Sequence, residues 1–320
     1  MLSKRIFIPQ AKNLYPSFPT FTEWDEKVYI FYRMGIKDES QPHGLYGKVI
    51  CTVIEKKQFL DYPALTDLAS GTVVFESANE LDAIVSKVDS AMFTLCTRTY
   101  VKGKIGKTYM SVSESPEFSQ RIEVCVKGVE WLVFYGKAFR ADSMVVFPAY
   151  GVLSGQQKTC PLVIATEDFK GFHLLSYIKE VCQPDIILNE NTIVHNGRQF
   201  LMFIRQDNPP FGLWYCTSTE LIKKWSMPKK LVENAHAPMA FNYNDKTLLL
   251  YRGLINKKSS TVMLSTVVDN NVISNAIDTY DGNPYDGGYG DIGIIDNRLF
   301  VIYYLGNVSG EPCIKVAEII

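Results

Sequence analysis

The hydrophobic positions of this chain gather in short runs that alternate with polar turns, and one kind of run recurs along the whole sequence. It is an apolar stretch rich in aromatic and β-branched residues, such as K-V-Y-I-F-Y-R at residues 27–33. Short runs of this composition, bounded by polar turns, predict β-strands. The six copies occupy residues 27–33, 91–98, 144–150, 200–205, 247–252 and 299–304, and their last residues lie 47 to 65 positions apart.

Each copy has strand-like neighbours on both sides. The copy at 200–205 follows the run I-I-L-N-E-N-T-I-V-H, and the dipeptide Asn196–Gly197 between them is a strong tight-turn signal. A third run, G-L-W-Y-C-T-S at 212–218, comes after it. Three or four strands per unit of about fifty residues, repeated six times, predict an all-β fold, a six-bladed β-propeller.

Two further features bear on the architecture. Helical spacing of apolar residues is sparse, and residues 173–182 are the stretch where a turn or two of helix is expected. No linker rich in Pro, Gly or Ser divides the chain, so we expect residues 1–320 to form a single propeller domain.

Composition and charge exclude several classes of function. Of the 320 residues, 47% are hydrophobic and 21% are charged, which is enough apolar material for a full core. The net charge of −1 offers no basic surface to nucleic acid or to an anionic membrane. No apolar stretch approaches the ~18 residues of a membrane span, and we expect no signal peptide because the first residues lack an apolar run.

The cysteines and histidines indicate a reducing compartment and no metal. The seven cysteines are an odd number without a C-x-x-C pair, and several lie inside apolar runs. We therefore expect reduced, buried thiols and a cytoplasmic location. The four histidines have no ligand spacing, so no metal site and no cofactor are expected.

The repeat restricts where chemistry can lie, because in a propeller the start of each first strand and the loop after each second strand open on one face. A desolvated guanidinium at such a place is costly unless an anion lies beside it. One interpretation is that each arginine is solvated or paired within its own blade, and the other is a shared site for a carboxylate, sulfate or phosphate. Four of the six second strands end with an arginine, and the last ends with a tyrosine, giving Arg33, Arg98, Arg205, Arg252 and Tyr304 as candidates for substrate binding.

Polar residues also stand at the starts of first strands. Glu190 begins an apolar strand between two asparagines, a place that packing does not explain, and Asp82 and His236 hold similar positions. Tyr289 lies in D-G-G-Y-G-D, residues 286–291, where glycines weaken a strand unless the backbone must bend or something approaches closely. We expect Tyr289 to be presented to the central pocket.

A weaker repeat points to a family. The turn S-T-E-L-I-K-K-W at 218–225 resembles the Asp-box of sialidase-like propellers, S-x-D-x-G-x-T-W, in Ser218, Glu220 and Trp225, although the acid is Glu and the glycine is missing. Residues 166–172 and 113–118 resemble further decayed copies. The chain is therefore similar to the sialidase superfamily, and such turns are structural in that family.

The resemblance implies roles for two residues. In sialidases a glutamate opens the first strand of the fourth blade, and an arginine follows about fifteen residues later, as Glu190 and Arg205 do here. The sixth blade opens with a tyrosine, so Tyr289 matches the sialidase nucleophile and Glu190 the carboxylate that activates it. A neutral tyrosine suits a substrate whose own carboxylate, carried at the anomeric carbon, would repel an anionic nucleophile.

The chain also departs from the sialidase pattern. P-S-F-P at residues 16–19 stands where sialidases carry the first arginine of their triad, and Lys257 and Lys258 stand near the place of the arginine from the fifth blade, with Arg252 a few residues earlier. The triad is therefore not the standard one. Sialic acid, Kdo and the bacterial nonulosonic acids all stay open as substrates.

The general acid/base has two candidates. Sialidases take this aspartate from a loop of the first blade, and the matching segment here, residues 34–44, contains Asp38. Related propeller enzymes carry an aspartate at the start of the second blade, where Asp82 stands. His43, in the same loop as Asp38, is expected to contact the substrate.

These observations predict a retaining exo-glycosidase that releases a terminal acidic 2-keto-3-deoxy sugar from a glycan or glycolipid. One alternative is a sialidase-like glycosidase acting on a neutral or sulfated sugar. Another is a carbohydrate-binding propeller without catalysis, since propellers host many functions. A tyrosine paired with a carboxylate favours catalysis, because a binding module has no use for that pair.

Overall fold

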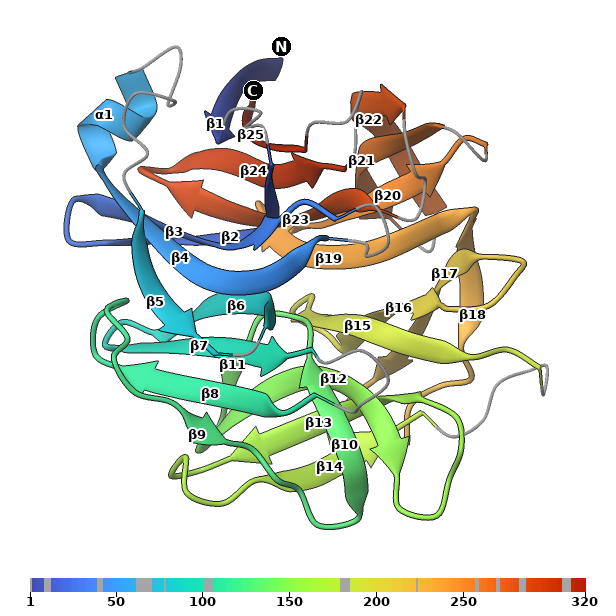
Figure 1. Ribbon diagram of the computed structural model, residues 1–320. Helices are drawn as coiled ribbons and strands as arrows, with labels where there is room; N and C mark the ends of the chain where they lie inside the picture. The colour runs from blue at the N-terminus through green and yellow to red at the C-terminus, as the bar shows by residue number, and fades with distance from the viewer. Residues whose placement is uncertain are drawn as a thin grey trace.

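The six predicted repeats are the six blades of a β-propeller (Figure 1). The computed structural model describes residues 2–8, 13–38, 43–61, 71–77, 79–100, 106–178, 185–222, 224–256, 259–268, 271–281, 286–306 and 312–320. Each predicted apolar run is the second strand of its sheet, where a period of two places alternate side chains against the two neighbouring blades. The all-β, six-bladed prediction is confirmed.

The first three blades follow one another around the axis. Blade 1 consists of β2 (Leu14–Trp24), β3 (Lys27–Ile36), β4 (Leu45–Glu55) and β5 (Thr72–Glu76). Blade 2 consists of β6 (Glu80–Asp89), β7 (Met92–Thr99), β8 (Thr108–Ser113) and β9 (Ile122–Glu123). Blade 3 has an interrupted first strand, and consists of β10 (Val129–Phe134), β11 (Phe139–Ala141), β12 (Met144–Leu153), β13 (Cys160–Thr166) and β14 (His173–Tyr177).

The last three blades complete the ring. Blade 4 consists of β15 (Leu188–His195), β16 (Phe200–Gln206), β17 (Gly212–Ser218) and β18 (Lys229–Glu233). Blade 5 consists of β19 (Ala235–Tyr243), β20 (Lys246–Leu254), β21 (Ser259–Val268) and β22 (Asn271–Asp281). Blade 6 consists of β23 (Gly287–Ile295), β24 (Arg298–Leu305), β25 (Cys313–Ile319) and, as its outer strand, β1 (Leu2–Ile8).

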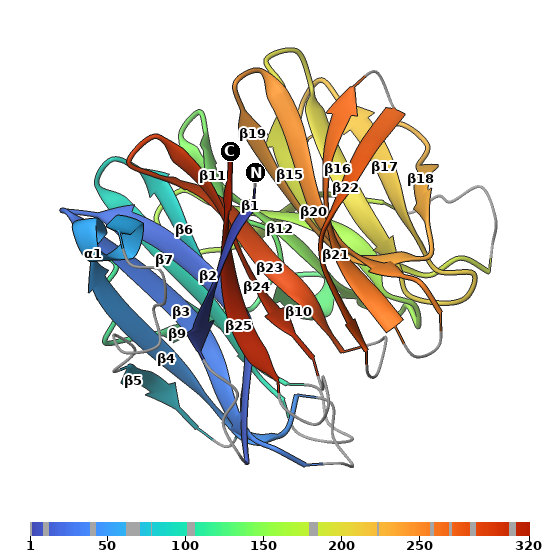
Figure 2. The ribbon, with the colours of Figure 1, turned by 90° about the horizontal axis from the view of Figure 1, so that it is seen from above.

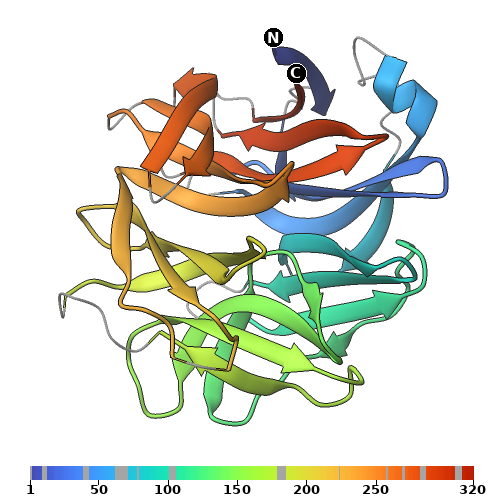
Figure 3. The same ribbon diagram turned by 180° about the vertical axis from the view of Figure 1, so that it is seen from behind.

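Blade 6 closes the ring with strands from both ends of the chain. β1 pairs antiparallel with β25, from Leu2 opposite Ile319 to Ile8 opposite Ile314. The two strands run side by side in the view from above and in the view from behind (Figures 2 and 3). Because β1 completes the sheet of the last blade, β25 is not left as an unpaired edge.

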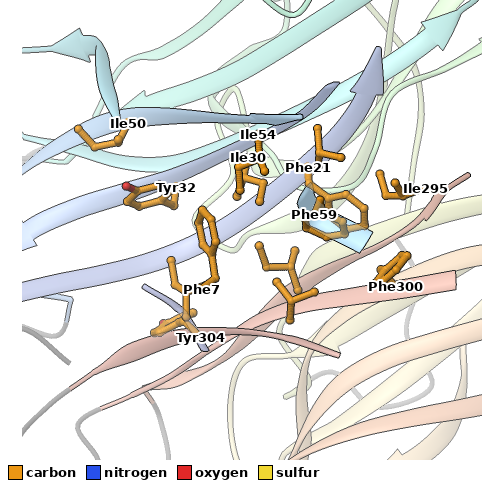
Figure 4. Packing of buried hydrophobic residues seen from close by; sticks show 14 of the residues in the cluster. Phe7, Phe21, Ile30, Tyr32, Ile50, Ile54, Phe59, Ile295, Phe300 and Tyr304 are labelled. Atoms are coloured by element: carbon orange, nitrogen blue, oxygen red, sulfur yellow. The ribbon is translucent and has the colours of Figure 1, made fainter. Parts of the chain in front are cut away.

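The core consists of apolar clusters between adjacent blades. In the cluster between blades 1 and 6, Phe59 packs against Phe300 with ring centroids 5.1 Å apart (Figure 4). Phe59 belongs to α1 (Lys56–Asp61), a short helix that the sequence pattern did not predict. Conversely, the prediction of a helix at 173–182 is wrong for the described residues of that stretch. Residues 173–177 form strand β14, which pairs with β13, because sheet pairing overrides the local spacing of apolar residues. No helix in the described parts of the chain is long and apolar enough to cross a membrane.

The first strands share an irregularity in their pairing with the second strands. In five blades two residues of the first strand oppose one residue of the second, which is a β-bulge, and a bulge re-aims side chains. The bulged pairs are Phe18–Pro19, Leu81–Asp82, Asn189–Glu190, Ala237–Pro238 and Gly288–Tyr289.

A polar cluster divides the propeller axis. Lys137, from the interruption between β10 and β11, forms an ion pair with the buried Asp291 of β23 at 2.6 Å. It also donates to the carbonyl oxygens of Phe21 and Val85, at 3.1 and 2.9 Å, so four blades meet there. A cavity of about 790 Å³ that Lys137 lines lies at one end of the axis, and a cavity of about 430 Å³ that Asp291 lines lies at the other.

Candidate active site

The cavity of about 430 Å³ lies where the first strands begin. Its size is typical of a small-molecule site. The bulged residues of β2, β6, β15 and β23 line it, together with the ends of the second strands β7 and β16 and three aromatic residues of blade 3. The bulges therefore turn their side chains toward the axis, as the repeat predicted for strand starts.

Tyr289 and Glu190 meet in this cavity. The Tyr289 hydroxyl donates to Glu190 Oε1 at 2.9 Å, and Arg205 Nη1 lies 2.9 Å from the same carboxylate oxygen and 3.0 Å from the Tyr289 oxygen. Burial, followed by the charge of Glu190, raises the pKa of Tyr289 above its usual value, while Arg205 opposes the rise. Tyr289 is therefore neutral at rest, with an acceptor for its proton and a cation beside its oxygen.

The glycines before Tyr289 give it this position. Gly287 and Gly288 have φ values of +93° and +72°, which side chains rarely adopt. A Cβ on Gly288 would lie 2.8 Å from the Cβ of Arg252, whose guanidinium packs against the Tyr289 ring at 5.4 Å from its centroid. The bulge and the missing side chains let Arg252 approach and the tyrosine turn inward.

The same triangle contains two polar atoms without a recorded partner. Glu190 Oε2 and Arg205 Nε are buried and have no hydrogen-bond partner among the described residues. Arg205 Nη2 pairs with Asp207 Oδ1 at 3.0 Å. An unused acceptor and an unused donor in a cavity are costly unless a bound molecule satisfies them.

Asp82 and Arg98 form a second acid–arginine pair on the cavity wall. Asp82 is a bulged residue that opposes Arg98 in the β6–β7 ladder, just as Glu190 opposes Arg205 in β15–β16. Burial raises the pKa of Asp82, and the charge of Arg98 opposes that rise. Two of the four predicted arginines thus line the cavity, and both pair within their own blade.

A third group joins blade 1 to blade 6. His43 Nδ1 lies 2.8 Å from Asp286 Oδ1 and 3.1 Å from the Tyr304 hydroxyl, which in turn donates to Asp286 Oδ1 at 3.2 Å. The imidazole lines the cavity, whereas the Tyr304 ring is fully buried and stacked on Tyr289, with centroids 6.3 Å apart. Burial raises the pKa of Asp286 to about 7.

Arg252 and His236 lie behind Tyr289 rather than in the cavity lining. Arg252 donates to the carbonyl oxygen of Gly287 at 2.7 Å and lies 2.9 Å from His236 Nδ1. Burial, with help from Arg205 and Arg252, lowers the pKa of His236 to about 2, so its imidazole is neutral. Arg252 therefore supports the Tyr289 ring, and His236 contacts Arg252.

Arg33 and Asp38 are not brought to the cavity. Arg33 is fully buried and donates to the carbonyl oxygens of Glu80, His43 and Gly44, so backbone acceptors take the guanidinium that the sequence assigned to a substrate anion. Arg33 therefore holds the turn that carries His43. Asp38 follows the end of β3 and does not line the cavity.

The sequence pattern did not predict several residues in or beside the cavity. Trp131, Tyr135 and Tyr150 of blade 3 supply an aromatic wall, and Tyr135 contacts Tyr289 with centroids 6.3 Å apart. Trp131 and Tyr135 were missed because the interruption of the first strand in blade 3 hides its repeat position, whereas Tyr150 ends the predicted run 144–150 at a position that the repeat marks. Asp286 was missed because it precedes its strand, although it stood beside the glycines that drew attention.

Metal ligation has no support in the described parts of the chain. No group of three His, Cys, Asp or Glu side chains there has an arrangement that holds a metal ion. Lys257 and Lys258, considered from the sequence, lie outside the described residues.

Comparisons with known proteins agree with this geometry at the level of fold. No protein-family model matches the sequence, and no curated protein matches it significantly. A protein of unknown function from Dyadobacter fermentans superposes with a TM-score of 0.80 at 11% identity, covering 99% of this chain and 98% of that one.

Sialidases of solved structure share the fold as well. Trypanosoma rangeli sialidase in complex with sialic acid superposes with a TM-score of 0.68 at 12% identity, over 99% of this chain and 57% of that one. A Hadza microbial sialidase gives 0.65 at 12% identity, over 94% and 65%. This chain thus spans little more than half of the trypanosomal enzyme, and its fold is a sialidase-like six-bladed β-propeller.

Proposed function

We propose that this protein is a retaining exo-glycosidase that releases a terminal acidic 2-keto-3-deoxy sugar from a glycan or glycolipid. Tyr289 is the nucleophile and Glu190 is its general base. The observation that carries the proposal is the contact of 2.9 Å between the Tyr289 hydroxyl and Glu190 inside the cavity, with Arg205 bound to both. A nucleophile, its base and a third group that orients the base are what covalent catalysis requires.

The chemistry takes two steps. In the first, the Tyr289 oxygen attacks the anomeric carbon as its proton moves to Glu190 Oε1, the glycosidic bond breaks, and the leaving group departs with a proton from an acid. In the second, water attacks the tyrosyl glycoside and gives a proton to the conjugate base of that acid, the phenol oxygen recovers its proton from Glu190, and the sugar leaves with retained configuration. Arg205, beside the phenol oxygen, stabilises the negative charge that develops there.

The proposed substrate charge follows from the neutral nucleophile. A carboxylate at the anomeric carbon would repel an anionic nucleophile, and a neutral tyrosine avoids this repulsion. Arg205 Nε has no acceptor among the described residues, and it is the donor that we assign to the substrate carboxylate. Asp82, held by Arg98, is assigned to sugar hydroxyls as a hydrogen-bond acceptor.

A second candidate is a neutral sugar, and one observation favours it. Both arginines that line the cavity already pair with carboxylates, Arg98 with Asp82 and Arg205 with Glu190 and Asp207. A substrate carboxylate therefore meets less free positive charge than four unpaired arginines would give.

The experiment is a panel of aryl glycosides of sialic acid, Kdo and neutral sugars, assayed with the wild type and with Tyr289→Phe. We expect turnover of an acidic glycoside and its loss in Tyr289→Phe. Turnover of a neutral glycoside alone selects the second candidate. Turnover that survives in Tyr289→Phe contradicts the mechanism, and sugar binding without any turnover assigns the propeller to carbohydrate binding alone.

We also infer that residues 1–320 act as one domain, since blades from both ends of the chain contribute to the cavity. The six described cysteines are unpaired, which supports a reducing compartment such as the cytoplasm.

A further inference from the structure

We propose that His43, with Asp286 as its proton partner, is the general acid/base of this site. This assignment deepens the proposed glycosidase function and rests on it. The Tyr289–Glu190 couple supplies the nucleophile but no proton for the leaving group. The described cavity wall also carries the carboxylates Asp207 and Asp291, but Asp207 pairs with Arg205 and Asp291 with Lys137. His43 and Asp82 are the candidates that we compare.

The geometry favours His43. Among the described residues both polar contacts of the imidazole use Nδ1, at 2.8 Å from Asp286 Oδ1 and 3.1 Å from the Tyr304 hydroxyl. The ring lines the cavity, so Nε2 is the atom left for a substrate. Phe18 lies between the two functional rings, 4.7 Å from the centroid of His43 and 5.1 Å from that of Tyr289.

The turn that carries His43 is held in a defined conformation. His43 has a φ of +66°, an uncommon value for a residue other than glycine. Its carbonyl oxygen and that of Gly44 accept hydrogen bonds from the buried Arg33. Arg33 thereby acts as a positioning residue, which gives a role to an arginine that the cavity does not use.

His43 changes from its acid form to its base form when Nε2 loses a proton and a second proton moves from Asp286 to Nδ1. In the acid form the Asp286 carboxyl donates its proton to Nδ1, and Nε2–H faces the cavity. When the glycosidic oxygen takes the Nε2 proton, the carboxyl proton passes to Nδ1 and Asp286 becomes a carboxylate. In the second step Nε2 accepts a proton from the attacking water, the Nδ1 proton returns to Asp286, and the acid form is restored. Protons and charge balance over the cycle.

The electrostatic surroundings suit this exchange. Burial and then the positive charges of Arg33, Arg252, Arg98 and Arg205 hold the pKa of His43 well below its usual value, so an imidazolium is disfavoured. Burial raises the pKa of Asp286 to about 7, against the effect of the Tyr304 hydrogen bond. Tyr15, whose ring lies 6.2 Å from His43, is the other titratable neighbour. The pair is thus uncharged below neutral pH, and its acid form is lost as the pH rises through about 7.

Asp82 is less suited to the role. Its carboxylate pairs with Arg98 on the cavity wall, and protonating it would remove the partner of that guanidinium. His43 and Asp286 can exchange a proton without breaking any ion pair of the arginines.

The test compares leaving groups in His43→Gln, Asp286→Asn and Asp82→Asn. The probes are a 4-methylumbelliferyl glycoside, whose leaving group needs little acid catalysis, and a methyl glycoside of the same sugar. General acid catalysis is worth about 10²–10⁴ in rate. We expect His43→Gln to lose activity in that range on the methyl glycoside and about tenfold or less in the glycosylation of the aryl glycoside. Azide should restore turnover of the aryl glycoside by replacing water in the second step.

A matched control and a second readout keep the outcomes distinct. His195→Gln, in the cavity at the opposite end of the axis, should leave both activities unchanged. Equal losses on both glycosides in His43→Gln, or the selective loss in Asp82→Asn instead, overturn the assignment while leaving the proposed function intact. Wild-type protein that turns over no glycoside contradicts the proposed function, and with it this role.

Nitrogen-15 NMR of the four histidines reads the proton on Nε2 directly, without a substrate. Comparison with His43→Gln identifies the resonance. We expect Nε2 of His43 to be protonated at pH 6 and to lose its proton near pH 7, and we expect this midpoint to disappear in Asp286→Asn. An Nε2 that keeps one state between pH 5 and 9 overturns the proposal.

Discussion

At the scale of single residues, the site depends on a tyrosine and an aspartate whose pKa values are raised by burial. The Tyr289 hydroxyl is held by Glu190 and Arg205, and its raised pKa keeps it protonated at rest. In the proposed mechanism it loses this proton only as it attacks. Asp286 follows the same physics, because burial disfavours its charged form. Both groups therefore depend on a partner that takes up or supplies the proton.

The raised pKa of Asp286 predicts how the stability of the fold changes with pH. Its pKa is raised to about 7 in the folded protein, whereas an unfolded aspartate titrates near ~3.9, so the folded state holds a proton that the unfolded state loses between these values. The wild type is thus expected to lose stability relative to Asp286→Asn as the pH rises from about 4 to about 7, with a constant difference above that. Calorimetric melting temperatures of both proteins from pH 4 to 9 measure it. A difference that does not depend on pH would contradict the raised pKa.

The placement of the site residues could be predicted from the sequence only in part. The sequence marked Tyr289 and Glu190, because a glycine-flanked tyrosine and an acid at an apolar strand start fit no packing role. It misplaced Arg33, since most acceptors of Arg33 are backbone carbonyl oxygens, those of Glu80, His43 and Gly44, and backbone acceptors leave no trace in side-chain identity.

At the scale of elements, the bulge at the start of the first strand decides what faces the axis. In β23 the bulged pair Gly288–Tyr289 opposes Tyr304, and in β15 the pair Asn189–Glu190 opposes Arg205. Acid and arginine thus come together through the ladder of one blade, whereas Tyr289 and Glu190 meet across the cavity. The sequence predicted the strands from their period, but a bulge adds one residue without changing composition, so it stayed hidden.

The bulge of β23 makes a prediction with a matched control. Gly288→Ala places a Cβ 2.8 Å from the Arg252 Cβ at a φ of +72°, and a left-handed conformation alone costs about 1–2 kcal/mol. We expect a free energy of unfolding lower by at least this amount and a lower turnover, because the backbone of Tyr289 must shift. Urea unfolding and the aryl glycoside assay measure the two effects.

Gly171→Ala is the control, because a Cβ there meets no atom within 4 Å. Its stability and turnover should stay within error of the wild type. If Gly288→Ala behaved like Gly171→Ala, the role given to the bulge would be wrong.

At the scale of the whole molecule, the blades are tied together at the axis and at the ring closure. Lys137 joins Asp291 of blade 6 to backbone carbonyls of blades 1 and 2, and it separates the two cavities. The six-fold repeat was visible in the sequence because each blade has the same second strand. The axial lysine was not, because it lies in an interruption of a strand and a lone lysine usually indicates solvent exposure.

Breaking the ion pair between Lys137 and Asp291 should lower the free energy of unfolding, and a second substitution should recover part of that loss. Lys137→Met leaves the buried Asp291 without its cation, although Thr20 and two backbone amides still donate to it. We expect a loss of on the order of 2–3 kcal/mol, somewhat below the usual cost of breaking a buried pair. Lys137→Met combined with Asp291→Asn should recover part of it, as measured by urea unfolding.

Lys107→Met, which breaks the exposed pair with Glu123, serves as the control and should leave the free energy of unfolding nearly unchanged, because exposed ion pairs contribute little. Equal effects of Lys107→Met and Lys137→Met would show that the axial pair does not hold the blades together.

The central claim is that Tyr289, activated by Glu190, forms a covalent bond to the sugar, and intact-protein mass spectrometry tests it most directly. The probes are 2,3-difluorinated 2-keto sugar acids, in which one fluorine departs readily and the other slows hydrolysis of the intermediate. We predict a single adduct of one sugar per chain, mapped to Tyr289 by peptide sequencing, absent in Tyr289→Phe and slow to form in Glu190→Gln. An adduct on another residue, or one that forms equally in Tyr289→Phe, would contradict the account.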